Sequence, residues 1–262
     1  MRKAIGWVVL SLVVAVVLSI YYYARQVPPL TPPIAQAPAP QPPAEPEIRY
    51  PIPQETEAPL PALDASDAAA REALAALWGL EAIERFFNVD GFIRRVVATV
   101  DNLTREKLAQ RLMPVKPVGG AFRTAGKGEN LTFAADNAAR YARYVNLATS
   151  VDTSNLVAVY FNFYPLFQRA YEDLGYPNRY FNDRLVEVID HLLATPDLPP
   201  EAKLVQPKVL YQFADPELEA RSAGQKMLLR MGNDNAARVK TKLREIRGAL
   251  TRKVPGDRLS TR

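Results

Sequence analysis

Apolar residues recur at helical spacing through most of the sequence after residue 64. Such a pattern is typical of amphipathic helices, because the face that packs on a core returns with a period of about 3.6 residues. It predicts helices over 67–78, 81–87, 90–101, 104–111, 136–149, 154–174, 180–194, 216–231 and 234–252.

The 154–174 helix carries a stripe of large side chains. These are Leu156, Tyr160, Tyr164, Phe167, Tyr171 and Leu174. Because their spacing is the one that burial on one helix face requires, we expect them to form the centre of the core. Pro165 is expected to kink or split this helix.

A different pattern interrupts the helices. The stretch VGGAFRTAGKGENLTFA has short alternating segments around a Gly-Lys-Gly turn, which predicts one β-hairpin at 121–133. The fold class expected is therefore mostly α: a single compact multi-helix domain over 64–253 with one small β-hairpin, followed by a flexible tail at 254–262.

The N-terminal 25 residues have another character. Residues 4–23 read AIGWVVLSLVVAVVLSIYYY and carry no charge. At about 1.5 Å per residue they cross a hydrocarbon core of roughly 30 Å, which predicts a transmembrane helix within 1–25. Arg2 and Lys3 precede the run and Arg25 alone follows it closely, so the positive-inside rule favours a cytoplasmic N-terminus.

A cleaved signal peptide is the alternative, since a basic start and an apolar run fit that class too. It fits less well, because the apolar run is long and the nearest pair of small residues with cleavage-site spacing, Ala35 and Ala37, lies far downstream.

A proline-rich segment follows the apolar run. Residues 27–63 hold thirteen prolines and no apolar period that a core would need. Polyproline II rises about 3.1 Å per residue, so this segment could reach on the order of 100 Å. We expect 26–63 to be a disordered Pro-rich linker.

Composition excludes several chemistries. The protein has no cysteine, and so it has no disulfide, no thiolate nucleophile and no cysteine-ligated zinc. The net charge of +5 is uneven: residues 221–262 carry twelve basic and three acidic side chains.

Basic side chains flank the apolar stripe of the 234–252 helix. The candidate contacts to an anionic surface are Arg238, Lys240, Lys242, Arg244 and Arg247. Lipid headgroups or an acidic wall polymer are the partners that such a face fits. A solvated basic face is the alternative, and the predicted topology argues against nucleic acid.

The turn between the 154–174 and 180–194 helices concentrates polar and aromatic residues. The candidate partner or ligand surface comprises Tyr176, Asn178, Arg179, Tyr180, Asn182 and Asp183. Recognition groups often lie on such element junctions. A purely structural turn, with Gly175 and Pro177 ending the first helix, is the alternative.

The only histidine, His191, follows Asp183 and Glu187 on the polar face of the 180–194 helix. These three side chains could hold a metal or supply acid–base chemistry, although a solvated acidic face explains them as well. Ser222 and Lys226 stand four apart, where the Ser-x-x-Lys motif needs three. No catalytic residue, metal site or cofactor is therefore predicted.

The phrases YFNDRLVEVIDHLL and SAGQKMLLRMG, with the residues around them, resemble a bacterial family catalogued as a domain of unknown function. Its members look like membrane-anchored proteins with a proline-rich tether and an α-helical domain of about this length. The resemblance implies an envelope protein of Gram-negative type. With the apolar run and its flanks, we expect a single-pass inner-membrane protein with its C-terminal domain in the periplasm. It implies no activity.

The sequence thus favours a membrane-anchored periplasmic binding or scaffolding module of the cell envelope, with no catalytic activity inferred. An envelope hydrolase or metal-dependent enzyme using Asp183, Glu187 and His191 is the alternative. A cytoplasmic nucleic-acid binder would require the opposite topology.

Overall fold

The structure is a computed structural model that describes residues 47–52 and 59–252. The predicted membrane span at 4–23, most of the predicted linker and the tail at 254–262 lie outside the described residues. Within the described ranges, no helix combines the length and the apolar character that crossing a membrane requires.

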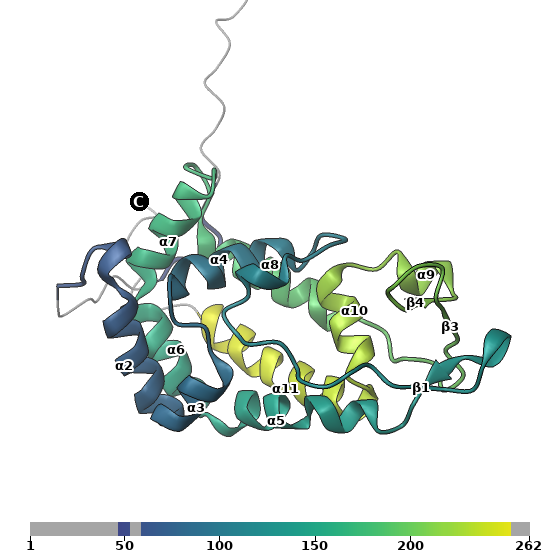
Figure 1. Cartoon of the computed structure of the whole chain (residues 1–262). Helices are drawn as coiled ribbons and strands as arrows, with labels where there is room; N and C mark the ends of the chain where they lie inside the picture. Colours follow the sequence, from purple (N-terminus) through teal and green to yellow (C-terminus); the bar gives the residue numbers. More distant parts are fainter. Residues whose placement is uncertain (1–46, 53–58, 253–262) are drawn as a thin grey trace, which may run out of the picture. The chain divides into compact units, whose positions relative to one another are not determined.

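The described part is mostly helical, as expected (Figure 1). The α-helices are α2 (Asp67–Trp78), α3 (Leu80–Phe86), α4 (Phe92–Asn102), α5 (Asn137–Ser150), α6 (Thr153–Asn162), α7 (Tyr164–Asp173), α8 (Phe181–Leu193), α9 (Pro216–Glu219), α10 (Ala223–Arg230) and α11 (Asn233–Leu250). Three short 3-10 turns are η1 (Leu63–Ala65), η2 (Gln110–Leu112) and η3 (Gly128–Asn130).

Two short hairpins lie near η3. The predicted hairpin is confirmed as β1 (Thr124–Ala125) paired antiparallel with β2 (Thr132–Phe133). A second hairpin, which the sequence pattern did not predict, pairs β3 (Leu204–Val205) with β4 (Gln212–Phe213). The hairpins join through the Leu204 N–H, which donates to the Leu131 carbonyl. They share a small apolar cluster with Leu218 of α9 and Leu229 of α10. In Figure 1 they lie with α9 at the end of the domain opposite α2 and α3.

The aromatic stripe forms the centre of the main core. Tyr164, Phe167 and Tyr171 of α7 are buried, and Phe181 at the start of α8 is fully buried against them. The rings of Phe167 and Phe181 stack with centroids 5.9 Å apart. The stripe ends before Leu174, which is 43% exposed.

Two of the predicted helices are each split in the structure. The 154–174 helix divides into α6 and α7 at Phe163, with Pro165 in the first turn of α7. The 216–231 helix divides because Ser222 caps a new start, where its hydroxyl oxygen accepts from the Gln225 N–H at 3.2 Å.

The predicted helix at 104–111 is absent; only η2 lies near its end. The carbonyls of Leu103 and Arg105 accept instead from Gly224 and Ala223, so the start of α10 uses the acceptors a continuing helix would need. Gly224 permits this approach, because a Cβ there would lie 2.6 Å from a Leu192 methyl and 2.9 Å from the Leu103 oxygen.

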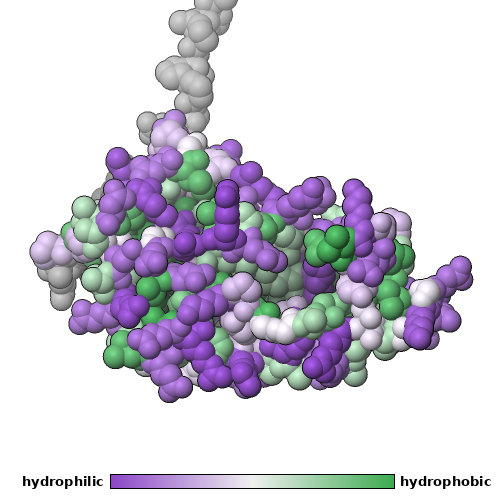
Figure 2. Space-filling view, in the orientation of Figure 1, coloured by the Kyte–Doolittle hydropathy of each residue, from purple (hydrophilic) through white to green (hydrophobic). Residues whose placement is uncertain are grey.

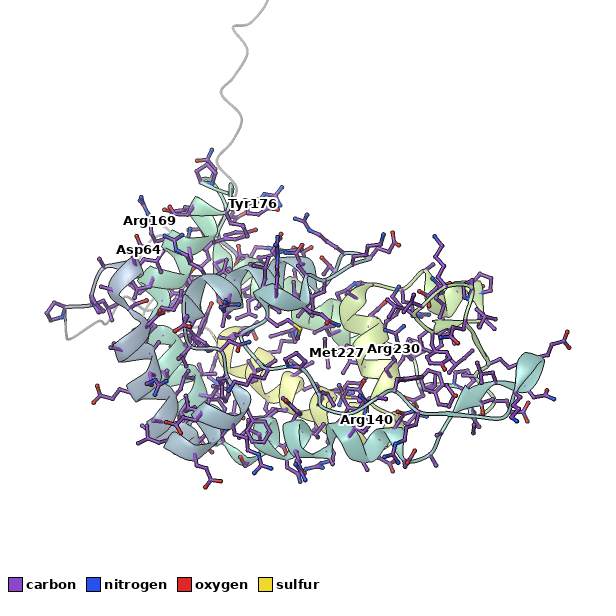
Figure 3. The ribbon with its side chains drawn as sticks, in the orientation of Figure 1. Asp64, Arg140, Arg169, Tyr176, Met227 and Arg230 are labelled. Carbon is purple, nitrogen blue, oxygen red and sulfur yellow. The ribbon has the colours of Figure 1, made fainter. Side chains whose placement is uncertain are left out.

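Part of the predicted linker belongs to the folded domain. Ile52 is 7% exposed and lies in the main core, and Leu60 and Leu63 pack against that core. Arg94 of α4 bridges Asp64 and Asp173 at 2.9 Å each, which fastens the η1 region to α7. Figure 3 shows Asp64 and Arg169, a second partner of Asp173, on the same side of the domain. The domain therefore includes residues that precede position 64.

Candidate functional site

The α7–α8 junction is built by a helix stop. The Tyr176 N–H donates to the Tyr171 carbonyl and the Gly175 N–H to the Glu172 carbonyl, which is the Schellman arrangement. It requires a positive φ, and Gly175 has φ of 113°. The backbone is thereby turned at once into the approach to α8.

The turn fixes Tyr176 within the domain. Its ring stacks on Tyr171 with centroids 4.6 Å apart, and its hydroxyl donates to Asp101 at 3.3 Å. Figure 3 shows Tyr176 at this end of α7. Tyr176 is thus half-buried and packs within the domain, whereas Asn178 and Arg179 of the predicted partner surface are exposed.

The remaining three predicted residues contact the N-terminal segment 47–52 through its backbone. The two carboxylate oxygens of Asp183 accept from the N–H groups of Arg49 at 2.9 Å and Tyr50 at 2.8 Å. The Asn182 amide donates to the Tyr50 carbonyl at 2.9 Å, and the Tyr180 hydroxyl accepts from the Ile52 N–H at 2.9 Å. We call Tyr180, Asn182 and Asp183 the clamp.

Contacts within α6, α7 and α8 position the clamp. The Tyr160 hydroxyl donates to the Asn182 side-chain oxygen at 3.3 Å, and the Tyr164 and Tyr180 rings lie 5.2 Å apart. The Gln168 side-chain oxygen accepts from the Phe181 N–H at 2.9 Å. Burial raises the pKa of both Tyr160 and Tyr164, so these hydroxyls stay protonated and can donate hydrogen bonds.

Two apolar side chains accompany the backbone contacts. Ile52 enters the main core, and Tyr50 packs against a separate apolar cluster that contains Val157 and Ile189. The arrangement holds a segment that bends at Arg49 and Tyr50 by its peptide groups, and it packs only one aromatic and one aliphatic side chain of that segment.

The predicted trio of Asp183, Glu187 and His191 does not assemble. Asp183 is engaged by segment 47–52, and Glu187 is exposed and pairs with Arg184 at 2.8 Å. His191 contacts Ser222 instead. Among the described residues, no three His, Asp or Glu side chains converge as metal ligands would.

His191 and Ser222 form a pair at the start of α10. The His191 Nε2 lies 2.8 Å from the Ser222 Oγ, at a recess of about 490 Å³ that Thr104, Arg221 and Gln225 also line. Burial, together with the Arg184 charge, lowers the pKa of His191, which favours the neutral imidazole. Since the Ser222 oxygen accepts from Gln225, its hydrogen is free to point at Nε2.

The pair lacks the other parts of an acyl-transfer site. Ser222 is buried and caps α10, and no carboxylate hydrogen-bonds to the second ring nitrogen of His191 within the described residues. The N–H groups of Ala223 and Gly224, which follow the serine, are taken by carbonyls and offer no oxyanion donors. The contact therefore fastens α8 to α10.

Comparison with known proteins identifies the family. The sequence model of a family described as "Protein of unknown function (DUF3014)" matches residues 92–247, which is more than half of the chain. The chain belongs to the DUF3014 family. No curated protein and no solved structure matches it.

The DUF3014 match includes the clamp and the His191–Ser222 pair, whereas segment 47–52 lies outside it. It also includes a buried acid that the sequence pattern did not single out. Asp101 of α4 is 3% exposed and pairs with Arg184 at 3.3 Å and Arg105 at 2.6 Å. A buried carboxylate requires such basic partners. The sequence signal that could have identified Asp101 is its position within the apolar pattern of the 90–101 helix.

The predicted basic surface on α11 is smaller than expected. Lys240 and Lys242 are buried, and their Nζ atoms donate to the Thr195 and Val151 carbonyls. They therefore fasten α11 to neighbouring loops and cannot serve as surface contacts. Arg247 pairs with Asp190.

Only Arg238 and Arg244 of the five predicted basic residues are exposed. The face of the domain seen in Figure 2 carries its hydrophobic residues in separate patches among hydrophilic ones.

Proposed function

We propose that the protein is a membrane-anchored binding or scaffolding module of the bacterial cell envelope. In this proposal, residues 4–23 anchor it in the inner membrane with the N-terminus in the cytoplasm, and the helical domain works in the periplasm. The uncharged apolar run, the basic residues before it and the resemblance to tethered envelope proteins support this location.

The observation that carries the binding role is the clamp. Four hydrogen bonds join side chains of residues 180–183 to the backbone of residues 49–52, which lie over 125 positions away in the sequence. Side chains that neighbouring helices hold in place and that are directed at another segment's peptide groups are what a recognition surface requires.

In this proposal, segment 47–52 is the part of the domain that the tether joins. The residues that precede this segment lead to the proposed anchor, so a pull on the tether acts on the start of α8 through Asp183.

In-cell photo-crosslinking tests the binding role. A photoreactive residue at Arg179, exposed beside the clamp, or at Arg244, exposed on α11, should capture a specific envelope partner or wall fragment. The matched control position is Glu201, which is exposed in the loop before β3. The absence of a specific adduct from both test positions would refute the role, and a reporter active in the periplasm fused after Arg262 tests the topology.

A hydrolase is the second candidate, favoured by the 2.8 Å contact between His191 and Ser222. It is tested by labelling with a fluorophosphonate, which reacts with activated serines. The binding proposal expects no labelling that distinguishes the native protein from Ser222→Ala. Labelling that this substitution abolishes would support the hydrolase.

A further inference from the structure

We propose that the clamp is a recognition site for a short peptide segment of a partner protein that bends as residues 49 and 50 do, and that residues 47–52 are an internal ligand that occupies it until the partner displaces them. This inference rests on the proposed binding function and names the ligand class. The ligand has two consecutive non-proline residues, the second of them aromatic, and an aliphatic residue two positions further on.

The clamp is preformed. Asn182 is held by Tyr160, Tyr164 approaches Tyr180, and Gln168 holds the first turn of α8, and none of these contacts involves segment 47–52. Departure of the segment therefore leaves the site's geometry in place. Asp183 is half-buried, so its carboxylate can be hydrated when the segment leaves.

The resident segment is held at few points. Glu47, Ile48, Arg49 and Pro51 are exposed, and Ile48 is 50% exposed. Ile52 is the only residue of the six that is fully buried. Segments with so few buried contacts open at lower free energy than the core to which they attach.

The hydrogen bonds define the ligand's backbone. Asp183 needs N–H groups at the positions of Arg49 and Tyr50, and Tyr180 needs one at the position of Ile52, so proline is excluded at all three. No bond uses the residue between them, where Pro51 stands. Proline is therefore accepted at that position.

Contacts made by the side chains define the rest of the pattern. The second position packs an aromatic ring against the cluster of Val157 and Ile189, and the fourth inserts an aliphatic group into the main core. Within the proline-rich sequence, residues 55–60 (ETEAPL) match the backbone pattern but have alanine in the aromatic position. They provide a matched control peptide.

A partner segment is a better occupant than a second copy. The same segment from another copy makes the same contacts, and the covalently attached one is present at higher effective concentration. Only a segment that gains contacts beyond those of residues 47–52 displaces it, and the exposed Asn178 and Arg179 beside the clamp offer such contacts.

Fluorescence anisotropy with a labelled EIRYPI peptide (residues 47–52) tests the inference in the full-length protein. Ile52→Asp vacates the clamp, because a carboxylate there cannot be buried in the apolar core. Because the clamp is then vacant, we expect this variant to bind the peptide at least about 10-fold more tightly than the native protein does. A factor of 10 corresponds to about 1.4 kcal/mol of binding free energy. Adding Asp183→Ala should weaken binding at least about 10-fold, and labelled ETEAPL should bind comparably weakly.

Two further variants keep the test decisive. Arg49→Pro removes one N–H to Asp183 without touching the core, so it should also raise peptide affinity even where Ile52→Asp disturbs folding. Ile48→Asp, at an exposed position, is the matched control and should leave affinity as in the native protein.

The inference would be overturned if the native protein, Ile52→Asp and Arg49→Pro all bound the peptide with equal affinity. It would also be overturned if the Ile52→Asp variant still bound the peptide after Asp183→Ala is added. Self-association of the native protein in sedimentation, lost with Asp183→Ala, would overturn the partner assignment in favour of a second copy. Crosslinking from Arg179 or Arg244 tests the envelope role separately, so either result can fail while the other stands.

Discussion

The carboxylate of Asp183 accepts a hydrogen bond at 2.8 Å from the backbone N–H of Tyr50, 133 positions earlier in the sequence. With the bond from Arg49, it makes one side chain at the start of α8 the receptor for two consecutive peptide groups. The docked segment therefore joins the N-terminal part of the protein to the region that matches the family.

The two isoleucines of the segment should differ sharply in their contribution to stability. Ile52→Ala removes a buried side chain and should lower the free energy of unfolding by about 1–3 kcal/mol, below the usual range for such a change because the segment can undock instead. Ile48→Ala, at an exposed position, should cost less than about 0.5 kcal/mol in the same urea titration. Equal effects would mean that the segment does not dock.

Tyr164 should contribute through both its ring and its hydroxyl. Tyr164→Ala should destabilise the domain by about 3–5 kcal/mol, as for other buried aromatics. Tyr164→Phe should cost about 1 kcal/mol, because the hydroxyl bonds Gln168 at 3.0 Å. Leu174→Ala is the control at the exposed end of the stripe, expected below about 1 kcal/mol. Thermal unfolding that ranked Leu174→Ala with Tyr164→Ala would contradict this packing.

Lys240 should behave as a buried structural residue. Lys240→Ala leaves the buried Thr195 carbonyl without its donor, so it should lower the free energy of unfolding by about 1–3 kcal/mol. Arg244→Ala, at an exposed position four residues on, should change it by less than about 0.5 kcal/mol. If both substitutions were neutral in denaturant unfolding, the lysine would be a surface residue after all.

Lys240 and Lys242 show what sequence patterns miss. Long basic side chains at the margin of an apolar stripe suggest a solvated face, and nothing in the sequence indicates that carbonyls of Val151 and Thr195 lie within their reach. The same limit applies to residues 47–52. Proline-rich composition suggested a linker, and only the apolar side chains of Tyr50 and Ile52 hinted that part of it docks.

Local patterns succeeded where local chemistry decides. The bounds of α2 were predicted to the residue, and the turn residues around Gly126 led to the β1–β2 hairpin. The helix expected at 104–111 does not form, because the N–H of Gly224, over a hundred positions later, donates to the Leu103 carbonyl. Of the six residues predicted as a partner surface, three form the clamp. Their target, the backbone of residues 49–52, could not be predicted, because a contact between segments over 125 positions apart leaves no local pattern in the sequence.

His191 provides a pH-dependent test. Its pKa is lowered in the folded state, so the folded protein favours the neutral ring while the unfolded protein takes up a proton near the ordinary pKa of about 6.5. The stability that this histidine contributes is therefore present above about pH 6.5 and is lost as the pH falls through the lower folded pKa.

Since it is the only histidine, a single imidazole signal in an NMR titration should report the folded pKa below about 6.5. His191→Asn should remove the corresponding fall in melting temperature on acidification. A signal that titrates above the ordinary pKa would contradict the buried environment described for this ring.

Amide hydrogen exchange at Arg49, Tyr50 and Ile52 in the full-length protein tests docking of the segment most directly. We expect these amides to exchange at least about 10-fold more slowly than in an unstructured peptide, and Asp183→Asn to remove most of that protection at Arg49 and Tyr50. Glu187→Gln, one turn along α8 on its exposed face, should leave the protection unchanged. Exchange of the native protein's three amides at the rate of a free peptide would contradict the clamp.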